Sequence, residues 1–158
     1  MNNNCKYDDH ITKTQNRSNR NANYSSNYTH KPYQPEKPEE VPEDFVTAAE
    51  NVMRGKGKSN LTTSKLRNIL SMASDIYNVE NNREEEHLAE ENKIALRKMH
   101  VRIVYEAGRD HDVCEFIKQS HLINYLKYIE DSWDRKMFIR FENYLEALVA
   151  YHRFFGGK

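Results

Sequence analysis

Hydrophobic residues are distributed unevenly along the chain, and residues 1–41 include few aliphatic side chains. Asn, Ser, Tyr, Lys and Pro dominate this stretch. Such a segment cannot bury enough apolar surface to offset the entropy that it would lose on ordering. We therefore predict a disordered polar tail over residues 1–41 and a folded domain over residues 42–158.

After residue 41, apolar residues recur at the spacing of amphipathic helices. Pro42 is followed by acidic residues and predicts the start of a short helix, because proline suits the first helical position. This helix should end near Gly55. The sequence GKGKSN at 55–60 then predicts a flexible connector.

The next predicted helix has a readable start at Thr62. Its hydroxyl can cap the helix, while Leu61 and Leu66 flank the cap as a hydrophobic staple. The stripe that follows comprises Leu66, Ile69, Leu70, Ala73, Ile76 and Tyr77. We expect this helix to end within residues 78–82.

A longer helix is predicted from about residue 83 to residue 107. The glutamates at 84–86 would lie in its first turn, where the helix dipole favours negative charge. Gly108 ends the helix, and Asp110 can cap a short helix that continues through residue 117. A further apolar segment covers residues 122–129.

The last predicted helix, about residues 132–155, is apolar over a wide arc. One side comprises Phe138, Phe141, Leu145, Leu148, Val149 and His152, and the band is extended by Met137, Tyr144, Tyr151 and Phe155. Such a helix is central to the core or also buried against a partner. For His152 we expect a hydrogen-bonded core position. The whole pattern predicts an all-α protein, a compact bundle of about five helices with a disordered N-terminal tail.

Charge is balanced overall, with 24 basic and 24 acidic residues, so the net charge indicates no nucleic-acid binding. The basic residues are nevertheless clustered. An acid-free stretch contains Arg54, Lys56, Lys58, Lys65 and Arg67. A second group, interrupted only by Glu106, comprises Lys93, Arg97, Lys98, Arg102 and Arg109.

Lys65 falls at the third position of its predicted helix, where a capping box would place Glu or Gln. Together with Lys56, Lys58 and Arg67 it opposes the positive end of the helix dipole, at roughly a few tenths of a kcal/mol per cation. A bound anion would relieve that cost, because free N–H groups with Lys and Arg form a phosphate site. The alternative is that these cations are only hydrated at the surface and bind no ligand.

Lys98, Arg102 and Arg109 fall close to one face if the long helix is unbroken. Arg102 can pair with Glu106 one turn away, which offers a purely structural explanation. Arg109 follows Gly108 at a corner between two helices, where a side chain can point outward.

Candidate catalytic and metal-binding residues are few. His111, Cys114 and His121 lack a fourth zinc ligand, and Glu142 and Glu146 have no partner suited to acid–base chemistry. Glycine-loop and nucleophile motifs are missing from the sequence. We therefore expect no catalytic residue, no metal, no cofactor and no enzymatic activity. The sequence also lacks an apolar leader and a membrane span, which predicts a cytoplasmic protein.

Three blocks, LTTSKLRNIL at 61–70, VRIVYEAGRD at 101–110 and FENYLEALVAYHRFFGGK at 141–158, together resemble the small helical subunit of the type III-A (Csm) CRISPR–Cas effector complex. The resemblance implies a non-catalytic subunit of an antiviral defence complex. Several copies would self-associate as an inner filament beside backbone and large subunits. The filament would bind the backbone of the guide RNA and the target RNA without sequence specificity.

By position, the resemblance implies that Lys65, Arg67, Arg102 and Arg109 belong to an RNA-binding surface, and local charge adds Lys56 and Lys58. This hypothesis requires the cations to share a surface without being buried against the protein's own carboxylates. One alternative is an assembly-only helical scaffold without RNA contact. Another is a DNA-binding regulator, whose only candidate recognition helix would be 61–77.

Overall fold

The computed structural model describes residues 37–55 and 61–157. The prediction of a disordered tail therefore lies mostly outside the described residues, as do Lys56, Lys58 and most of the predicted connector. The described residues all belong to one compact unit.

Six helices make up the described part of the chain, and the only β-type pairing there is an isolated bridge between His87 and Asp134. The helices are α1 (Phe45–Arg54), α2 (Thr63–Glu80), α3 (Glu90–Arg109), α4 (His111–Gln119), α5 (Leu122–Ser132) and α6 (Arg135–Phe154). The predicted all-α bundle is confirmed. Within these described ranges, none of the helices combines the length and the apolar character needed to cross a bilayer.

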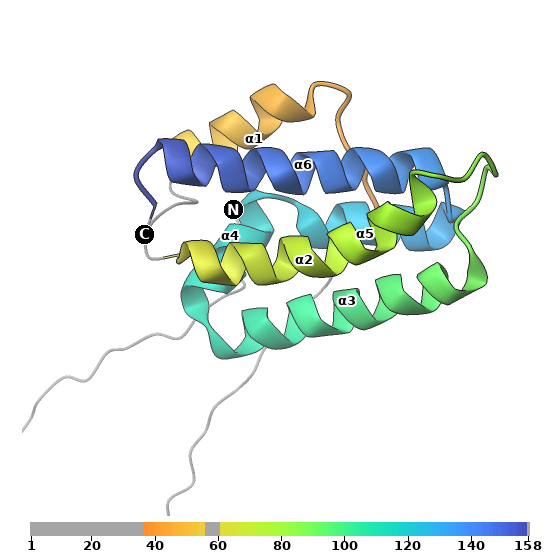
Figure 1. The fold of residues 1–158 in the computed structure, drawn as a ribbon. Helices are drawn as coiled ribbons and strands as arrows, with labels where there is room; N and C mark the ends of the chain where they lie inside the picture. Colours follow the sequence, from red (N-terminus) through yellow and green to blue (C-terminus); the bar gives the residue numbers. More distant parts are fainter. Residues whose placement is uncertain (1–36, 56–60, 158) are drawn as a thin grey trace, which may run out of the picture. The chain divides into compact units, whose positions relative to one another are not determined.

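Helix α6 is central to the bundle (Figure 1). It packs against α1 on one side and α2 on another, while α2 also packs against α3. Helices α4 and α5 complete the bundle through contacts with α3. Segments far apart in sequence thus lie side by side, with α2 between α6 and α3.

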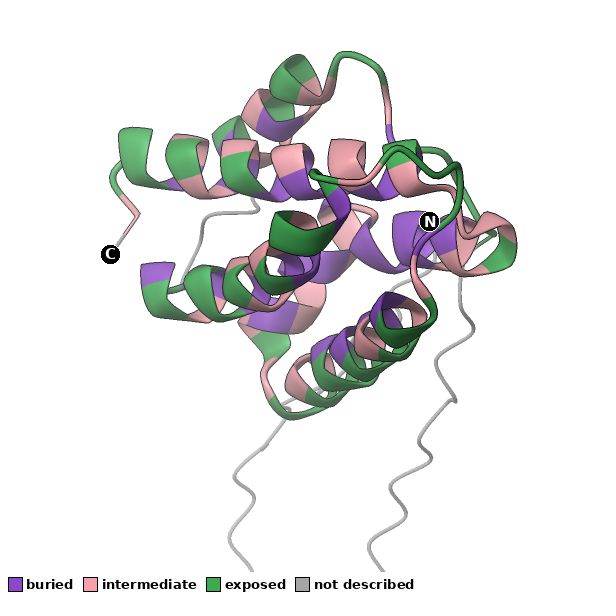
Figure 2. Cartoon of the chain, turned by 45° about the vertical axis from the view of Figure 1, so that its right-hand side comes forward, coloured by how far each residue is buried: buried purple, intermediate pink, exposed green. Residues whose placement is uncertain are grey.

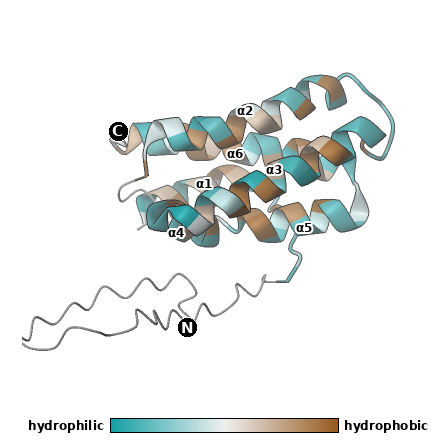
Figure 3. Ribbon diagram, turned by 90° about the horizontal axis from the view of Figure 1, so that it is seen from below, coloured by the Kyte–Doolittle hydropathy of each residue, from teal (hydrophilic) through white to brown (hydrophobic). Residues whose placement is uncertain are grey.

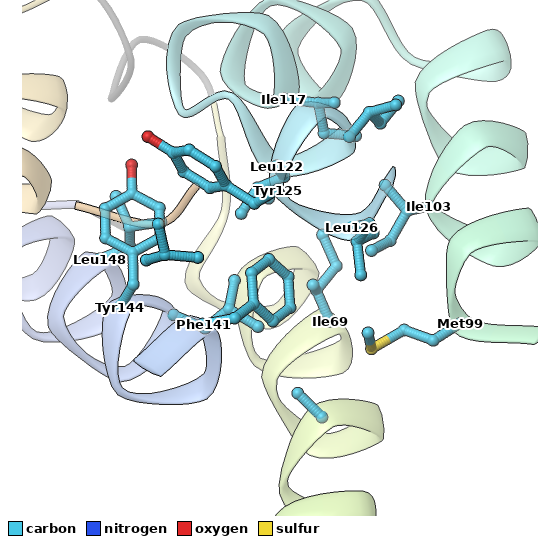
Figure 4. Close-up of a cluster of buried hydrophobic side chains, with 14 of the residues drawn as sticks. Ile69, Met99, Ile103, Ile117, Leu122, Tyr125, Leu126, Phe141, Tyr144 and Leu148 are labelled. Atoms are coloured by element: carbon cyan, nitrogen blue, oxygen red, sulfur yellow. The ribbon is translucent and has the colours of Figure 1, made fainter. Parts of the chain in front are cut away.

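The core is formed by the inward faces of all six helices, as the buried stripes in Figure 2 show. In Figure 4, Ile69 of α2, Met99 and Ile103 of α3, Leu126 of α5 and Phe141 of α6 gather in one cluster. The predicted stripe of α2 is buried at Leu66, Ile69, Ala73 and Ile76, and that of α6 at Phe138, Phe141, Leu145, Leu148 and His152. Periodic burial of these faces is the main source of the bundle's stability.

Two of the predicted caps are confirmed. The Thr62 hydroxyl accepts a hydrogen bond from the Lys65 backbone N–H at 3.4 Å. The Asp110 carboxylate accepts hydrogen bonds from the N–H groups of Asp112 and Val113, at 3.1 and 3.2 Å, and so caps α4. Each cap satisfies backbone donors that have no partner inside the first turn of a helix.

The first helix begins later than Pro42. Asp44 caps it by accepting a hydrogen bond from the Thr47 N–H at 3.1 Å, and the first helical residue is Phe45. Upstream of the helix, Val41 is buried and its carbonyl accepts a hydrogen bond from Arg140 at 3.1 Å. The packed structure thus includes residues before the predicted domain boundary at 42.

Helix α3 begins at Glu90, so its predicted start at residue 83 is wrong. The buried carboxylate of Glu80 accepts hydrogen bonds from Arg83 at 2.8 Å and from the Ala89 N–H at 2.9 Å, which holds residues 81–89 as a loop. The Leu88 N–H donates to the Trp133 carbonyl at 3.0 Å. The glutamates at 84–86 therefore lie in this loop rather than in a helical first turn, because tertiary hydrogen bonds outweigh the local charge pattern.

Candidate nucleic-acid interface

An open groove runs between α2 and α3. Its lining residues are Asn68, Ser71, Met72, Asp75 and Ile76 from α2, and Asn92, Ala95, Lys98, Met99 and Arg102 from α3. Lys98 and Arg102 are one helical turn apart, so they project from the same wall. Polar Asn68 and Ser71 are exposed on the opposite wall, where Asp75 is the acidic residue.

Lys65 joins the start of α2 to the corner between α3 and α4. Its ammonium group donates a short hydrogen bond to Asp110 Oδ2, while Oδ1 of the same carboxylate caps α4. These contacts, with the Lys65 hydrogen bond first among them, lower the pKa of Asp110 below its usual value. The sequence predicts that a bound anion relieves the Lys65 charge, but Asp110 already supplies a negative charge there. The Lys65 side chain is 37% exposed and is thus only partly available to a ligand.

Arg67 is exposed on α2, one helical turn before the groove residue Ser71. Within the described ranges, neither Arg67 nor Lys98 makes a salt bridge. No carboxylate of the described residues therefore lies within ion-pair distance of these two cations.

Arg102 and Arg109 share one carboxylate at the end of α3. Arg102 lies 2.9 Å from Glu106, as predicted from their spacing, and Arg109 lies 3.8 Å from the other carboxylate oxygen of Glu106. Both side chains remain mostly exposed, at 59% and 61%. Their guanidinium carbons also lie 5.7 and 5.6 Å from the ring centre of Tyr105. Both arginines are thus held at the surface rather than buried.

The second basic group of the sequence is divided by the fold. Lys93 and Arg97 lie over the ring of Trp133, with the charged groups 5.5 and 4.9 Å from its centre. These two cations stabilise the contact between α3 and the α5–α6 corner. Of the same basic group, Lys98 and Arg102 line the groove and Arg109 lies at its end.

The sequence-predicted residues are therefore brought together in part. Lys65 and Arg109 lie at the same end of the α2–α3 pair, since Asp110 contacts Lys65 and follows Arg109 directly. Arg102 lines the groove and Arg67 adjoins it, whereas Lys56 and Lys58 lie outside the described residues. Lys98 is not among the predicted RNA-binding residues, although its spacing of four residues from Arg102 places both on one wall. The exposure of Tyr105 could not be predicted, because it depends on how α3 packs.

The described residues contain no cluster of three or more His, Cys, Asp and Glu side chains that could hold a metal ion. Buried His152 is hydrogen-bonded to the Leu61 carbonyl at 2.8 Å, which confirms its expected core position. Glu142 is buried against Ser74, 3.0 Å from its hydroxyl. These polar groups join helices inside the core and lie apart from the groove lining.

Comparison with known proteins gives a consistent match. The family model described as Csm2 Type III-A matches residues 39–158, a range that includes all three sequence blocks. The Csm2 protein of a CRISPR system in Streptococcus thermophilus is 36% identical over 121 residues, which cover 73% of this chain and 94% of the relative. The Mycobacterium tuberculosis Csm2 protein is 33% identical over 122 residues, with 75% and 96% covered. The Enterococcus italicus Csm2 protein is 33% identical over 97 residues, with 61% and 69% covered. The chain thus belongs to the Csm2 family, the small subunits of type III-A Csm complexes.

Proposed function

We propose that this chain is a non-catalytic RNA-binding subunit of the type III-A interference complex in antiviral defence in the cytoplasm. Copies of it form an inner filament beside the backbone and large subunits. They bind the sugar-phosphate backbone of the guide RNA and the target RNA without reading sequence. The observation that carries this proposal is the line of exposed cations Lys98, Arg102 and Arg109 along one side of the α2–α3 groove and its end.

The contribution of each cation to RNA binding depends on whether one of the protein's own carboxylates pairs with it. Arg102 and Arg109 share Glu106, but a guanidinium group has five N–H donors and so retains donors for phosphate oxygens. Lys98 and Arg67 form no ion pair with a carboxylate of the described residues, so their charges are available to phosphate groups. Lys65 is engaged by Asp110, so its ammonium group is only partly available to a phosphate. The binding surface therefore rests more on Arg67, Lys98, Arg102 and Arg109 than on Lys65.

Backbone binding by such a surface depends on salt, because each phosphate contact releases condensed counterions. Phosphate contacts position a protein on a nucleic acid but carry no sequence information. In a complex that carries a guide RNA, base pairing provides the sequence readout. A surface of cations, amides and hydroxyls is thus suited to holding RNA of any sequence.

The test uses the assembled complex with Lys98→Glu and Arg102→Glu combined, compared with Lys136→Glu on the exposed surface of α6 as the matched control. The double variant should weaken target RNA binding and reduce the slope of log K against log salt by roughly 1.5 or more, since two phosphate contacts are lost. The control should leave both quantities unchanged. Unchanged affinity and salt slope in a fully assembled double variant would reject the proposal.

The alternative of an assembly-only scaffold is favoured by a different observation. Ile94 and Val101 on the outer face of α3 are 56% and 70% exposed, and Figure 3 shows hydrophobic segments among hydrophilic ones along this helix. Exposed apolar residues on one face are typical of a protein contact. Under this alternative, Val101→Asp disrupts the complex, whereas the charge reversals leave RNA binding intact. Measuring assembly and RNA affinity on both variants separates the two functions.

A further inference from the structure

We propose that Tyr105, with Arg102 and Arg109, forms a stacking site for an unpaired nucleobase of bound RNA. This inference rests on the proposed RNA-binding function and adds a contact to a base, in addition to the contacts with phosphates. It concerns the end of α3, next to the groove.

Tyr105 lies on the open surface of α3. Its side chain is 56% exposed, whereas Ile103, two residues earlier on the opposite face, is fully buried. Packing in the core therefore does not explain why an aromatic residue occupies this position. The guanidinium carbons of Arg102 and Arg109 lie over the ring, 5.7 and 5.6 Å from its centre, and the residue as a whole still keeps more than half of its surface exposed.

Glu106 makes this site ordered before a ligand arrives. Its two carboxylate oxygens hold Arg102 at 2.9 Å and Arg109 at 3.8 Å, so the two long side chains are already restrained around the ring. Restraint of flexible groups in the free protein lowers the entropic cost of binding. The ring and the two guanidinium groups over it together form an aromatic and cationic surface, which is suited to a flat ligand that carries negative charge nearby.

An RNA nucleotide has both of these features. Single-stranded nucleic acids bind where bases stack on aromatic rings and cations contact the backbone, and stacking tolerates any base because each has a π-face. Val101, one turn before Tyr105 and 70% exposed, extends the apolar surface beside the ring. Paired bases already stack within a duplex, so the ligand of this site is an unpaired nucleotide.

The experiment compares Tyr105→Ala with Tyr105→Phe in the assembled complex. The matched control is Phe154→Ala, because Phe154 is also an exposed aromatic residue, at 78%, but lies at the end of α6, outside the groove lining. The probes are a single-stranded RNA with 2-aminopurine at one unpaired position and a fully paired duplex of the same sequence. Binding is measured over a series of salt concentrations.

Tyr105→Ala should weaken binding of the single-stranded RNA by about fivefold to a hundredfold, the range for loss of one stacked base. It should also reduce quenching of 2-aminopurine. The salt slope should stay unchanged because no charge is removed. Tyr105→Phe should behave as the unmodified protein, and duplex binding should be unaffected by either variant.

Equal binding and quenching by Tyr105→Ala and the unmodified protein would overturn the stacking site. In that case, a loss of RNA affinity in the combined Lys98→Glu and Arg102→Glu variant would still support the proposed RNA-binding function, without the stacking site. Loss of a neighbouring subunit on Tyr105→Ala, with RNA affinity unchanged in the remaining complex, would identify a protein contact instead. That result too would overturn the inference.

Discussion

The imidazole Nε2 of His152, near the end of α6, lies 2.8 Å from the carbonyl oxygen of Leu61, directly before α2. A carbonyl oxygen only accepts hydrogen bonds, so Nε2 carries the proton. Nδ1 lies 3.4 Å from the Thr63 hydroxyl oxygen, within hydrogen-bond distance. This buried histidine thus fixes the start of α2, and with it the position from which Lys65 and Arg67 project.

Replacing His152 with alanine should lower the free energy of unfolding by about 2–4 kcal/mol, because it leaves a cavity and an unpaired carbonyl in the core. Chemical denaturation of the purified subunit measures the change. Arg153→Ala, at the exposed neighbouring position, is the control and should have an effect within about 0.5 kcal/mol. Equal stability of the two variants would show that the Leu61–His152 contact contributes little.

Among the described carboxylates, Glu80 should be the one whose replacement lowers the stability of the fold most. It is fully buried and accepts hydrogen bonds from the Asn92 amide at 2.6 Å and the Ala89 N–H at 2.9 Å, besides its pair with Arg83. Glu80→Ala removes the acceptor of the Asn92 amide and the Ala89 N–H, which should destabilise the fold by about 3–5 kcal/mol.

A second readout links this loop to the groove. Because Glu80 holds the start of α3, Glu80→Ala should also displace Lys98 and Arg102 and so weaken RNA binding by the assembled complex. Glu84→Ala removes an exposed glutamate of the same loop and is the control. A stability loss as small as that of the control would contradict the prediction.

Glu142 predicts an unusual dependence of stability on pH. It is buried between α6 and α2, and burial raises its pKa, an effect increased by Glu146 and opposed by the Ser74 hydrogen bond. The unfolded chain therefore releases this proton at lower pH than the folded one. The contribution of Glu142 to stability is complete below the unfolded pKa and is lost as pH rises through the higher folded pKa.

Glu142→Gln keeps the shape and removes the charge, so it should raise the melting temperature at neutral pH and reduce the change in stability between acidic and neutral pH. Thermal unfolding over a pH series tests this directly. Glu91→Gln, at an exposed position of α3, removes a carboxylate that does not act on Glu142 and should leave the pH profile of Glu142 in place. A variant that melts earlier than the unmodified protein at neutral pH would show that the buried carboxylate is favourable when ionised.

The coupling free energy between Lys65 and Asp110 should be small. Both side chains are partly exposed, at 37% and 25%, and such ion pairs are worth about 0.2–1 kcal/mol in double-mutant cycles. Asp110→Asn retains an acceptor for the α4 cap, so it should cost less than Asp110→Ala, which loses the cap as well, at about 1 kcal/mol. A cycle with Lys65→Met, measured by denaturation, gives the coupling energy.

The low pKa of Asp110 adds a pH signature to this cycle. Its stabilising charge is present above the unfolded pKa and is lost as pH falls through the folded pKa. The coupling should therefore disappear in acid. A coupling energy that is unchanged at low pH would indicate a contact without charge.

The amino-acid sequence by itself determined the features that depend on neighbours within a turn or two. The caps at Thr62 and Asp110, the pair of Arg102 with Glu106, and the buried stripes of α2 and α6 could all be predicted. Their physical basis is local: hydrogen bonds to the first turn, side chains one turn apart, and burial of a periodic apolar face. The three sequence blocks also indicated the family correctly.

Only the tertiary structure decided which distant residues meet. The start of α3 depends on Glu80 and Trp133, and the partner of Lys65 is a cap 45 residues away. The groove, its cations and the exposure of Tyr105 likewise follow from how α2 and α3 pack together. Helix spacing specifies which face of a helix is buried, but the register between two helices depends on the packing of the whole core, which no short stretch of sequence contains.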